Sequence, residues 1–127
     1  GPYQIKAAIG ALHVQASAYG QTDWRQIILL YDSLLVHEPS PVVRLNRAVA
    51  LAEAGALDPA LGELAALEGA LESYQPYHAV RADMLVRVGA GDAAAAAFRR
   101  AIALSGTEAE RRFIDARLQS IAPRAID

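Results

Sequence analysis

The amino-acid sequence predicts an all-α fold, and two observations carry this prediction. Alanine and leucine are frequent while aromatic residues make up only 6% of the chain, a balance that favours helices over sheets. Small residues also recur every 34 positions, as in Ala48, Ala82 and Ala116, or in Gly55 and Gly89. A helix-turn-helix unit of this length buries a continuous core only when it stacks on its neighbours. The expected architecture is therefore a right-handed stack of about seven antiparallel helices, a solenoid of helical hairpins.

Apolar periodicity and turn signals divide the chain into seven expected helices, which we assign to a single domain over residues 1–127. Their expected ranges are 3–18, 23–37, 41–54, 58–71, 76–88, 92–105 and 108–121. In the first helix, Ile5 and Ile9 fall at helical spacing, and Gly20 with Gln21 ends it.

The second and third helices have recognisable start signals. Asp23 can cap the second helix, with Gln26 three residues on to complete a capping box, and Pro39 lies just beyond the helix end. Ser40 followed by Pro41 opens the third helix. The serine oxygen accepts a free backbone N–H there, and proline at the first helical position costs no hydrogen bond.

The fourth and fifth helices repeat these devices. Asp58 and Pro59 open the fourth helix. Its apolar side is expected to carry Leu61, Leu64, Leu67 and Leu71. Gly89 is expected to end the fifth helix, because glycine readily adopts the left-handed conformation found just past helix ends.

The sixth helix contains an alanine run, residues 93–97, whose small side chains let a neighbouring helix approach closely. Thr107 with Glu110 predicts a capping box at the start of the seventh helix. The apolar face of the seventh helix is expected to comprise Phe113, Ile114, Leu118 and Ile121. Pro123 is expected to end the ordered chain.

Composition and charge argue against several classes of function. A formal net charge of −2 is unsuited to neutralising phosphates, so direct contact with nucleic acid is not expected. The chain has no cysteine, and no apolar run is long enough to span a bilayer. We expect a soluble, cytoplasmic protein.

The chain offers no pattern typical of catalysis, cofactor binding or metal binding. His13, His37 and His78 lie on different expected helices without a histidine or carboxylate one helical turn away. For His78 we expect a hydrogen-bonded structural role. We therefore expect no enzymatic activity, no cofactor and no metal.

The repeat resembles the tetratricopeptide pattern. Gly55 and Gly89 fall at its inter-helix turn, Ala48 and Ala82 at the small position of the first helix of each unit. The second-helix small positions hold Ala60 and Ala94. The match is divergent, because Arg47 and Arg81 stand where the pattern expects an apolar residue.

A second resemblance covers nearly the whole chain and rests on eight short segments. They are GPYQI at 1–5, TDW at 22–24, LYD at 30–32, PSPVV at 39–43, LNRAVA at 45–50, YHA at 77–79, RAD at 81–83 and ERRF at 110–113. In this order they are similar to the C-terminal tetratricopeptide-like extension of one group of bacterial extracytoplasmic-function RNA polymerase sigma factors. Since the chain starts at Gly1 without an initiator methionine, we expect a fragment of a longer protein.

The resemblance implies a non-catalytic regulatory domain that modulates transcription initiation. Its partner would be protein, either the sigma domains that precede it in the longer chain or RNA polymerase. Candidate partner-binding residues are Tyr31, Asp32, Asn46, Arg47, Tyr77, His78, Arg81, Asp83, Arg111 and Arg112.

Two alternatives apply to the arginines at the helix seam. Arg47 and Arg81 occupy equivalent positions one repeat apart, so both guanidinium groups can face a partner from the same side of the stack. Alternatively, each pairs with a local acid such as Asp32 or Asp83. Asn46 either satisfies a neighbouring backbone group or holds an extended peptide.

The sequence is also compatible with two alternative functions. A pocket near Asn46, Arg47, His78 and Arg81 could sense an anionic metabolite. The domain could also be a plain oligomerisation scaffold, although a monomer is favoured.

Overall fold

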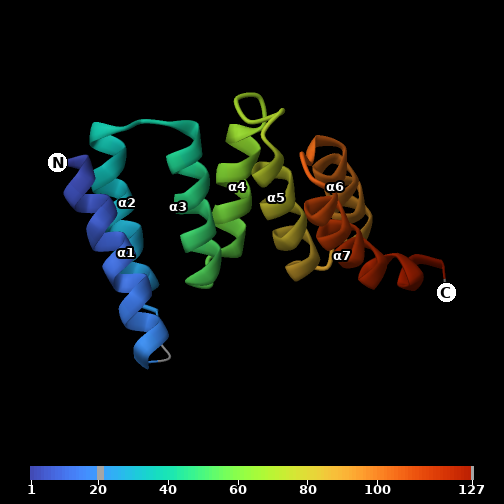
Figure 1. The fold of residues 1–127 in the computed structure, drawn as a ribbon, viewed down its shortest axis with the longest axis horizontal. Helices are drawn as coiled ribbons and strands as arrows, with labels where there is room; N and C mark the ends of the chain where they lie inside the picture. The colour runs from blue at the N-terminus through green and yellow to red at the C-terminus, as the bar shows by residue number, and fades with distance from the viewer. Residues whose placement is uncertain (20–21, 127) are drawn as a thin grey trace. The chain divides into compact units, whose positions relative to one another are not determined.

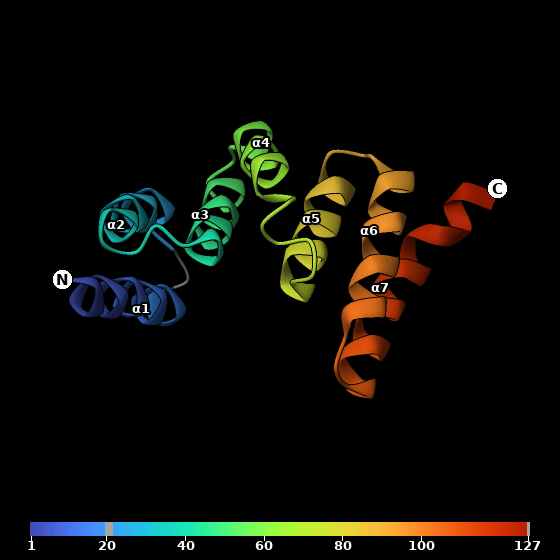
Figure 2. The same cartoon turned by 90° about the horizontal axis from the view of Figure 1, so that it is seen from above.

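The computed structural model describes the backbone of residues 1–19 and 22–126, and the side chains of residues 1–13 and 22–121. Within these ranges the chain forms seven α-helices and no strand (Figures 1 and 2). The helices are α1 (Pro2–Tyr19), α2 (Trp24–His37), α3 (Pro41–Glu53), α4 (Leu57–Leu67), α5 (Gln75–Arg87), α6 (Gly91–Leu104) and α7 (Glu108–Ile126). The predicted all-α fold is confirmed. Gly20 and Gln21, predicted to end the first helix, lie outside the described residues.

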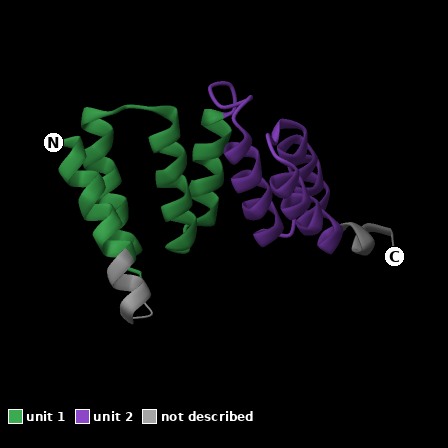
Figure 3. Cartoon of the chain, in the orientation of Figure 1, with its two compact units in different colours: residues 1–67 green, residues 68–127 purple. Residues whose placement is uncertain are grey.

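The helices fall into two compact units, residues 1–67 and 68–127 (Figure 3). The assignment of the whole chain to a single domain stays a prediction.

In the first unit, each helix packs against the next one in the chain, from α1 through α4. One core cluster is built from Ile9, Ile27 and Ala50, with Trp24 and Tyr31 packed against it. Trp24 also meets the ring of His13 edge-on, at 5.5 Å between ring centroids. Trp24 thus lies at the seam between α1 and α2.

In the second unit, α5 packs against α6 and α6 packs against α7. Its core cluster of buried residues contains Ala82, Ala97, Phe98, Ala101, Ile114 and Leu118. Three of these six are alanines, so the helices can approach closely around the larger rings and chains of Phe98, Ile114 and Leu118.

Three of the predicted helix caps are present, whereas α4 already begins at Leu57, so Asp58 lies in its first turn instead of capping it. The side-chain oxygen of Asp23 accepts the backbone N–H of Gln26 at 3.1 Å. Ser40 accepts from the N–H of Val43 at 3.3 Å, and Thr107 accepts from the N–H of Glu110 at 3.1 Å. These bonds satisfy donors that every helix N-terminus leaves without an intrahelical partner.

The predicted glycine turns are also present. Gly55 and Gly89 have φ angles of 94° and 81°, in the left-handed region. After α5, the N–H of Ala90 bonds to the carbonyl of Leu85 at 2.9 Å and that of Gly89 to Val86 at 3.0 Å. This is the bonding pattern of a Schellman helix end, which requires a left-handed residue at the glycine position.

The repeat phase holds in the interior of both units. Ala48, Ala82, Ala60 and Ala94 are all fully buried, as the tetratricopeptide pattern requires of its small positions. The phase is lost in α7, where Ala116 is exposed. As the last helix, α7 has no following helix within the described chain to cover that side.

Three sequence-based predictions about helix ends and faces are wrong. The fourth helix ends at Leu67 instead of residue 71, because Gly69 lowers the helix propensity directly beyond it, although Leu71 is still buried in the following turn. The seventh helix runs through Pro123 to Ile126, since proline removes one hydrogen bond without forbidding helical dihedral angles. Phe113 is 68% exposed, because α7 turns Ile114 and Leu118 toward the core instead.

Candidate functional site

Arg47 on α3 is paired with Asp32 on α2. Its Nε atom donates to Oδ1 of Asp32 at 2.7 Å, and the Arg47 side chain is 25% exposed. The local-acid alternative therefore describes Arg47. Its neighbour Asn46 is exposed, so the amide side chain is accessible to a partner. Tyr31, next to Asp32, is half-buried, and burial raises the pKa of its phenol.

Asp83 on α5 is paired with Arg117 on α7, so it does not neutralise Arg81. The guanidinium of Arg117 also lies over the ring of Phe98, 5.7 Å from its centroid. Asp83 and Arg117 thus connect the first and last helices of the second unit. The alternative in which Asp83 pairs with Arg81 is therefore wrong.

Arg81 itself is half-buried and makes no hydrogen bond or ion pair with any described residue. The repeat explains this difference from Arg47. The position 34 residues after Asp32 is occupied by Ala66, so the repeat reproduces the arginine without reproducing its acid. The donors of Arg81 therefore remain available.

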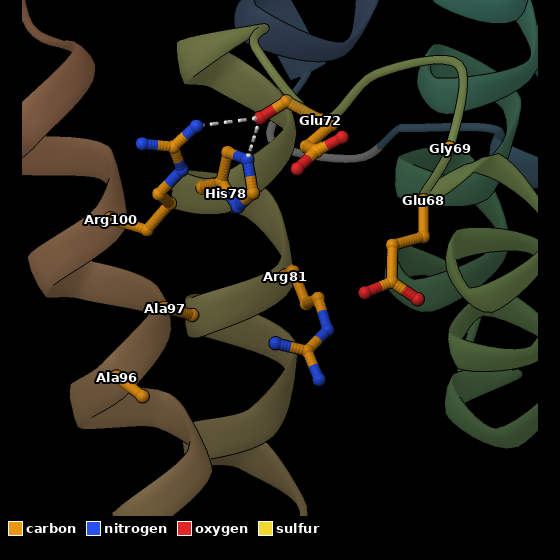
Figure 4. Close-up of a pocket in the computed structure, with 8 residues that line it drawn as sticks. All are labelled: Glu68, Gly69, Glu72, His78, Arg81, Ala96, Ala97 and Arg100. Carbon is orange, nitrogen blue, oxygen red and sulfur yellow. Dashed lines mark hydrogen bonds between the residues drawn. The ribbon is translucent and has the colours of Figure 1, made fainter.

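A pocket of about 540 Å³ surrounds Arg81 in the second unit (Figure 4). Its walls come from α5, from α6 and from the connection that precedes α5. The lining residues are Glu68, Gly69, Glu72, His78, Arg81, Ala96, Ala97 and Arg100. Ala96 and Ala97 contribute little bulk, which leaves space next to the charged side chains.

The connection before α5 is tied to both helices through one carbonyl group. The backbone oxygen of Glu72 lies 2.6 Å from Nε2 of His78 on α5, and Arg100 on α6 donates to the same oxygen at 3.5 Å. Because a carbonyl only accepts, Nε2 of His78 must carry the hydrogen. This is the structural role that we expected for His78.

The pocket carries both signs of charge. Arg81 and Arg100 contribute positive charge to its lining, and Glu68 and Glu72 contribute negative charge. Glu68 makes no hydrogen bond or ion pair with a described residue. In Figure 4, the side chains of Arg81 and Glu68 extend toward one another from opposite walls. Burial raises the pKa of Tyr77, Arg81 lowers it and Glu68 raises it, so both charges lie close to this phenol.

Tyr77 is not a surface residue. Only 1% of it is exposed, and its ring meets that of His78 edge-on at 5.1 Å. The prediction that Tyr77 contacts a partner directly is therefore wrong. A large aromatic at this position fills the interior beside the pocket.

The arginines at the start of α7 contact local groups. Arg111 donates to Glu108 at 3.2 Å and to the carbonyl of Ser105 at 3.1 Å. Arg112 pairs with Glu108 at 3.3 Å while its side chain stays 78% exposed. Arg112 and its exposed neighbour Phe113 thus form an accessible patch, and a role in binding a partner stays a prediction.

The structure distributes the predicted site residues over both units. Tyr31, Asp32, Asn46 and Arg47 belong to the first unit, and the other six belong to the second. Only His78 and Arg81 line the described pocket. Sequence reasoning missed Glu68, Glu72 and Arg100, although one signal for Arg100 was present: it stands one helical turn after the small residues Ala96 and Ala97.

Two features are absent from the described residues. No group of three or more His, Cys, Asp or Glu side chains is placed to hold a metal ion. None of the described helices combines the length and apolar character needed to cross a membrane.

The fold and its repeat define a tetratricopeptide-like helical domain. Its solved structural neighbours include PcrH from Pseudomonas aeruginosa, with 16% identity and a TM-score of 0.74 over 96% of this chain and 94% of that one. PcrH in complex with the chaperone-binding region of PopD gives 17% identity and a TM-score of 0.73 over 97% and 95%. The Arabidopsis OM64 TPR domain gives 16% identity and 0.68 over 94% and 98%. At these identities the likeness establishes the fold alone.

An uncharacterized protein of Rhizobium meliloti (strain 1021) is a closer relative in sequence. It is 44% identical over 122 residues, which cover 96% of this chain but only 29% of that protein. The chain thus spans less than a third of the relative's length. No family model matches the chain.

Proposed function

We propose that this chain is a non-catalytic, protein-binding regulatory domain of a bacterial extracytoplasmic-function sigma factor. It docks on the promoter-binding sigma domains of the same polypeptide or on RNA polymerase, and thereby modulates transcription initiation. Direct contact with nucleic acid is not part of this proposal.

The observation that carries the proposal is the tetratricopeptide-like repeat. Stacked helical hairpins of this kind bury one set of faces and leave an extended surface for other proteins. One structural neighbour, PcrH, is in complex with a segment of PopD. Asn46 and Arg112 are accessible in the first and second unit respectively, and both lie in segments that resemble the sigma-factor extension.

The sigma-factor context is supported by two observations. The eight family-like segments occur in order along nearly the whole chain. The Rhizobium relative matches over only 29% of its length, which leaves most of that protein for other domains. In the proposed context those domains would bind the polymerase and read the promoter.

Calorimetry and NMR test the docking directly. The sigma domains of a longer protein that carries this region are produced separately and titrated into the ¹⁵N-labelled 127-residue domain. We expect a heat of binding together with shifted amide signals around Asn46 or Arg112. If neither partner shows heat or a shifted spectrum, and RNA polymerase also fails to bind, the proposal is wrong.

Charge reversal on the α7 patch provides a more local test. Arg112→Glu should weaken docking several-fold if α7 faces the partner, because a charge at the rim of an interface contributes to association. Arg99→Glu is the matched control, since Arg99 is an exposed arginine on α6 outside the candidate set. Sedimentation of the free domain checks the scaffold alternative, which requires a dimer or larger species at micromolar concentration.

A further inference from the structure

The pocket in the second unit contains two opposite charges that do not pair with one another. Arg81 and Glu68 both line it, and neither makes a hydrogen bond or ion pair with a described residue. Figure 4 shows the two side chains on opposite walls of this pocket. A half-buried guanidinium without an acid is unusual, because partial desolvation of a charge is costly unless a partner compensates it.

The surrounding groups limit what could occupy this space. Arg81 retains all its guanidinium donors, whose planar arrangement suits a carboxylate. The carboxylates of Glu68 and Glu72 repel an ordinary anion but attract a cationic nitrogen. Ala96 and Ala97 on α6 provide an apolar surface for the carbon atoms of a ligand. The pocket volume of about 540 Å³ lies within the usual range for small-molecule sites.

We propose that this pocket binds a zwitterionic ligand, with a carboxylate held by Arg81 and a cationic nitrogen held by Glu68. Two sources share this chemistry: a free amino acid, and a polypeptide segment with an acidic and a basic side chain side by side. The expectation of a purely anionic metabolite is thereby replaced, because it took no account of the two glutamates. The inference does not depend on a sigma-factor context or on docking.

The other polar groups of the pocket position its walls. The bonds from His78 and Arg100 to the carbonyl of Glu72 hold the connection before α5 against both helices. Glu68 lies at the start of this connection. The segment that carries the Glu68 carboxylate is therefore anchored at its other end, at Glu72. This anchoring limits how far Glu68 can move away from Arg81.

An NMR titration of the ¹⁵N-labelled 127-residue chain tests the proposal with two probes. L-glutamine represents the free amino acid, and the blocked peptide acetyl-Glu-Lys-amide carries the same two charges on side chains. Acetate and methylammonium chloride each supply one half of the zwitterion. We expect at least one probe to shift the amide signals of Gly69, Ala96 and Ala97, and neither half alone to match it. Binding of L-glutamine assigns the site to a small molecule, and binding of the peptide alone assigns it to a polypeptide.

Three variants locate the binding. Arg81→Gln and Glu68→Gln should each weaken binding by about tenfold or more, since each leaves one charge of the ligand without its partner. Arg99→Gln removes an exposed arginine of α6 that does not line the pocket, and should leave the affinity unchanged. If Arg81→Gln does not fold, Arg81→Lys replaces it, because lysine keeps the charge but not the planar fork.

Several results would overturn the inference. It is wrong if neither probe shifts the pocket signals at millimolar concentration. It is also wrong if acetate binds as well as the zwitterions, which would indicate a simple anion site. Equal weakening in Arg99→Gln would show that the effect is one of net charge. Docking of sigma domains can succeed or fail in its own assay whatever this titration shows.

Discussion

Arg47 and Arg81 occupy the same position in successive repeats, but among the described residues only Arg47 has a charge partner. The Arg47 guanidinium is neutralised by Asp32, at 2.7 Å, so a protein partner that approaches Arg47 must compete with this pair. The Arg81 guanidinium has no such competitor among the described residues, because Ala66 stands at the position equivalent to Asp32. Of the two arginines, Arg81 is therefore the better candidate for binding an external carboxylate.

Ala82 tests the packing of the second unit at the level of one residue. Its side chain is fully buried in the cluster that includes Phe98 and Ile114. Ala82→Leu adds volume where the helices are already in contact. We expect the free energy of unfolding to fall by about 1 to 3 kcal/mol, measured by chemical denaturation.

Ala116 is the matched control for this substitution. It stands 34 residues after Ala82, yet it is exposed on α7. Alanine and leucine have similar helix propensities, so Ala116→Leu should change the free energy of unfolding by less than about 0.5 kcal/mol. A similar loss in both variants would mean that burial at the seam is not the cause.

Tyr31 and Tyr77 predict a loss of stability at alkaline pH. Burial raises the pKa of both phenols above the ordinary value of 10.0. The unfolded chain therefore ionises these tyrosines first as the pH rises. Their contribution to the free energy of unfolding is complete below pH 10 and is lost as the pH rises above it.

Denaturation at about pH 8 and about pH 11 measures this loss. The double variant Tyr31→Phe, Tyr77→Phe should be less stable than the parent at the lower pH but should lose less on the step to the higher pH. An equal loss in both proteins would assign the alkaline sensitivity to other groups.

At the scale of the element, the end of α5 depends on a glycine with positive φ. Gly89 has a φ of 81°, and a Cβ atom there would meet no neighbour within 4 Å, so only the backbone conformation opposes a side chain. Gly89→Ala should therefore lower the free energy of unfolding by about 1 to 2 kcal/mol. Thermal and chemical denaturation both report this change.

Gly91 provides the control two residues further on. It is the first residue of α6, its φ is not in the left-handed region, and it is equally open to solvent. Gly91→Ala should be neutral or stabilising, because alanine restricts the unfolded chain more than glycine does. If the two variants behave alike, the helix end does not need its left-handed residue.

The last helix shows how neighbours decide which face is buried. Ile114 and Leu118, one helical turn apart, pack into the core of the second unit, whereas Phe113 is offset from them by one residue and lies in solvent. Both faces of α7 carry apolar residues. Only packing against α6 selects Ile114 and Leu118.

At the scale of the whole molecule, the open question is how many cooperative units the chain contains. The contacts divide it into residues 1–67 and 68–127, whereas we predict one domain from the sequence. Neighbouring repeats stabilise one another, and short repeat arrays often unfold in one step. We expect calorimetry to show a single transition, with equal calorimetric and van't Hoff enthalpies.

One substitution in each unit tests whether the two units unfold together. Leu34 is buried in the first unit, and Leu34→Ala should cost about 2 to 5 kcal/mol. Leu34→Ala and Ala82→Leu should both lower the temperature of the same transition. Two transitions, each moved by only one variant, would establish two independent domains.

Features that depend on local chemistry could be predicted from the sequence. Caps at Asp23, Ser40 and Thr107 need only a side-chain oxygen within reach of the following backbone, and left-handed ends at Gly55 and Gly89 need only a missing Cβ atom. The burial of the repeated alanines could be predicted because they recur with the 34-residue period of the helical hairpins. For this reason the fold class and most helix ranges were predictable.

The side chains that meet across helices could not be predicted in this way, because they depend on how the helices pack. Residues far apart in the chain determine the pairing of Asp83 with Arg117 and the burial of Tyr77. They also leave Arg81 without an ion pair among the described residues. The mixed-charge pocket is of the same kind, since Glu68, Arg81 and Arg100 come from three separate segments. Helical periodicity predicts which residues share a face of one helix. The distance between the faces of two helices is set by how the helices pack.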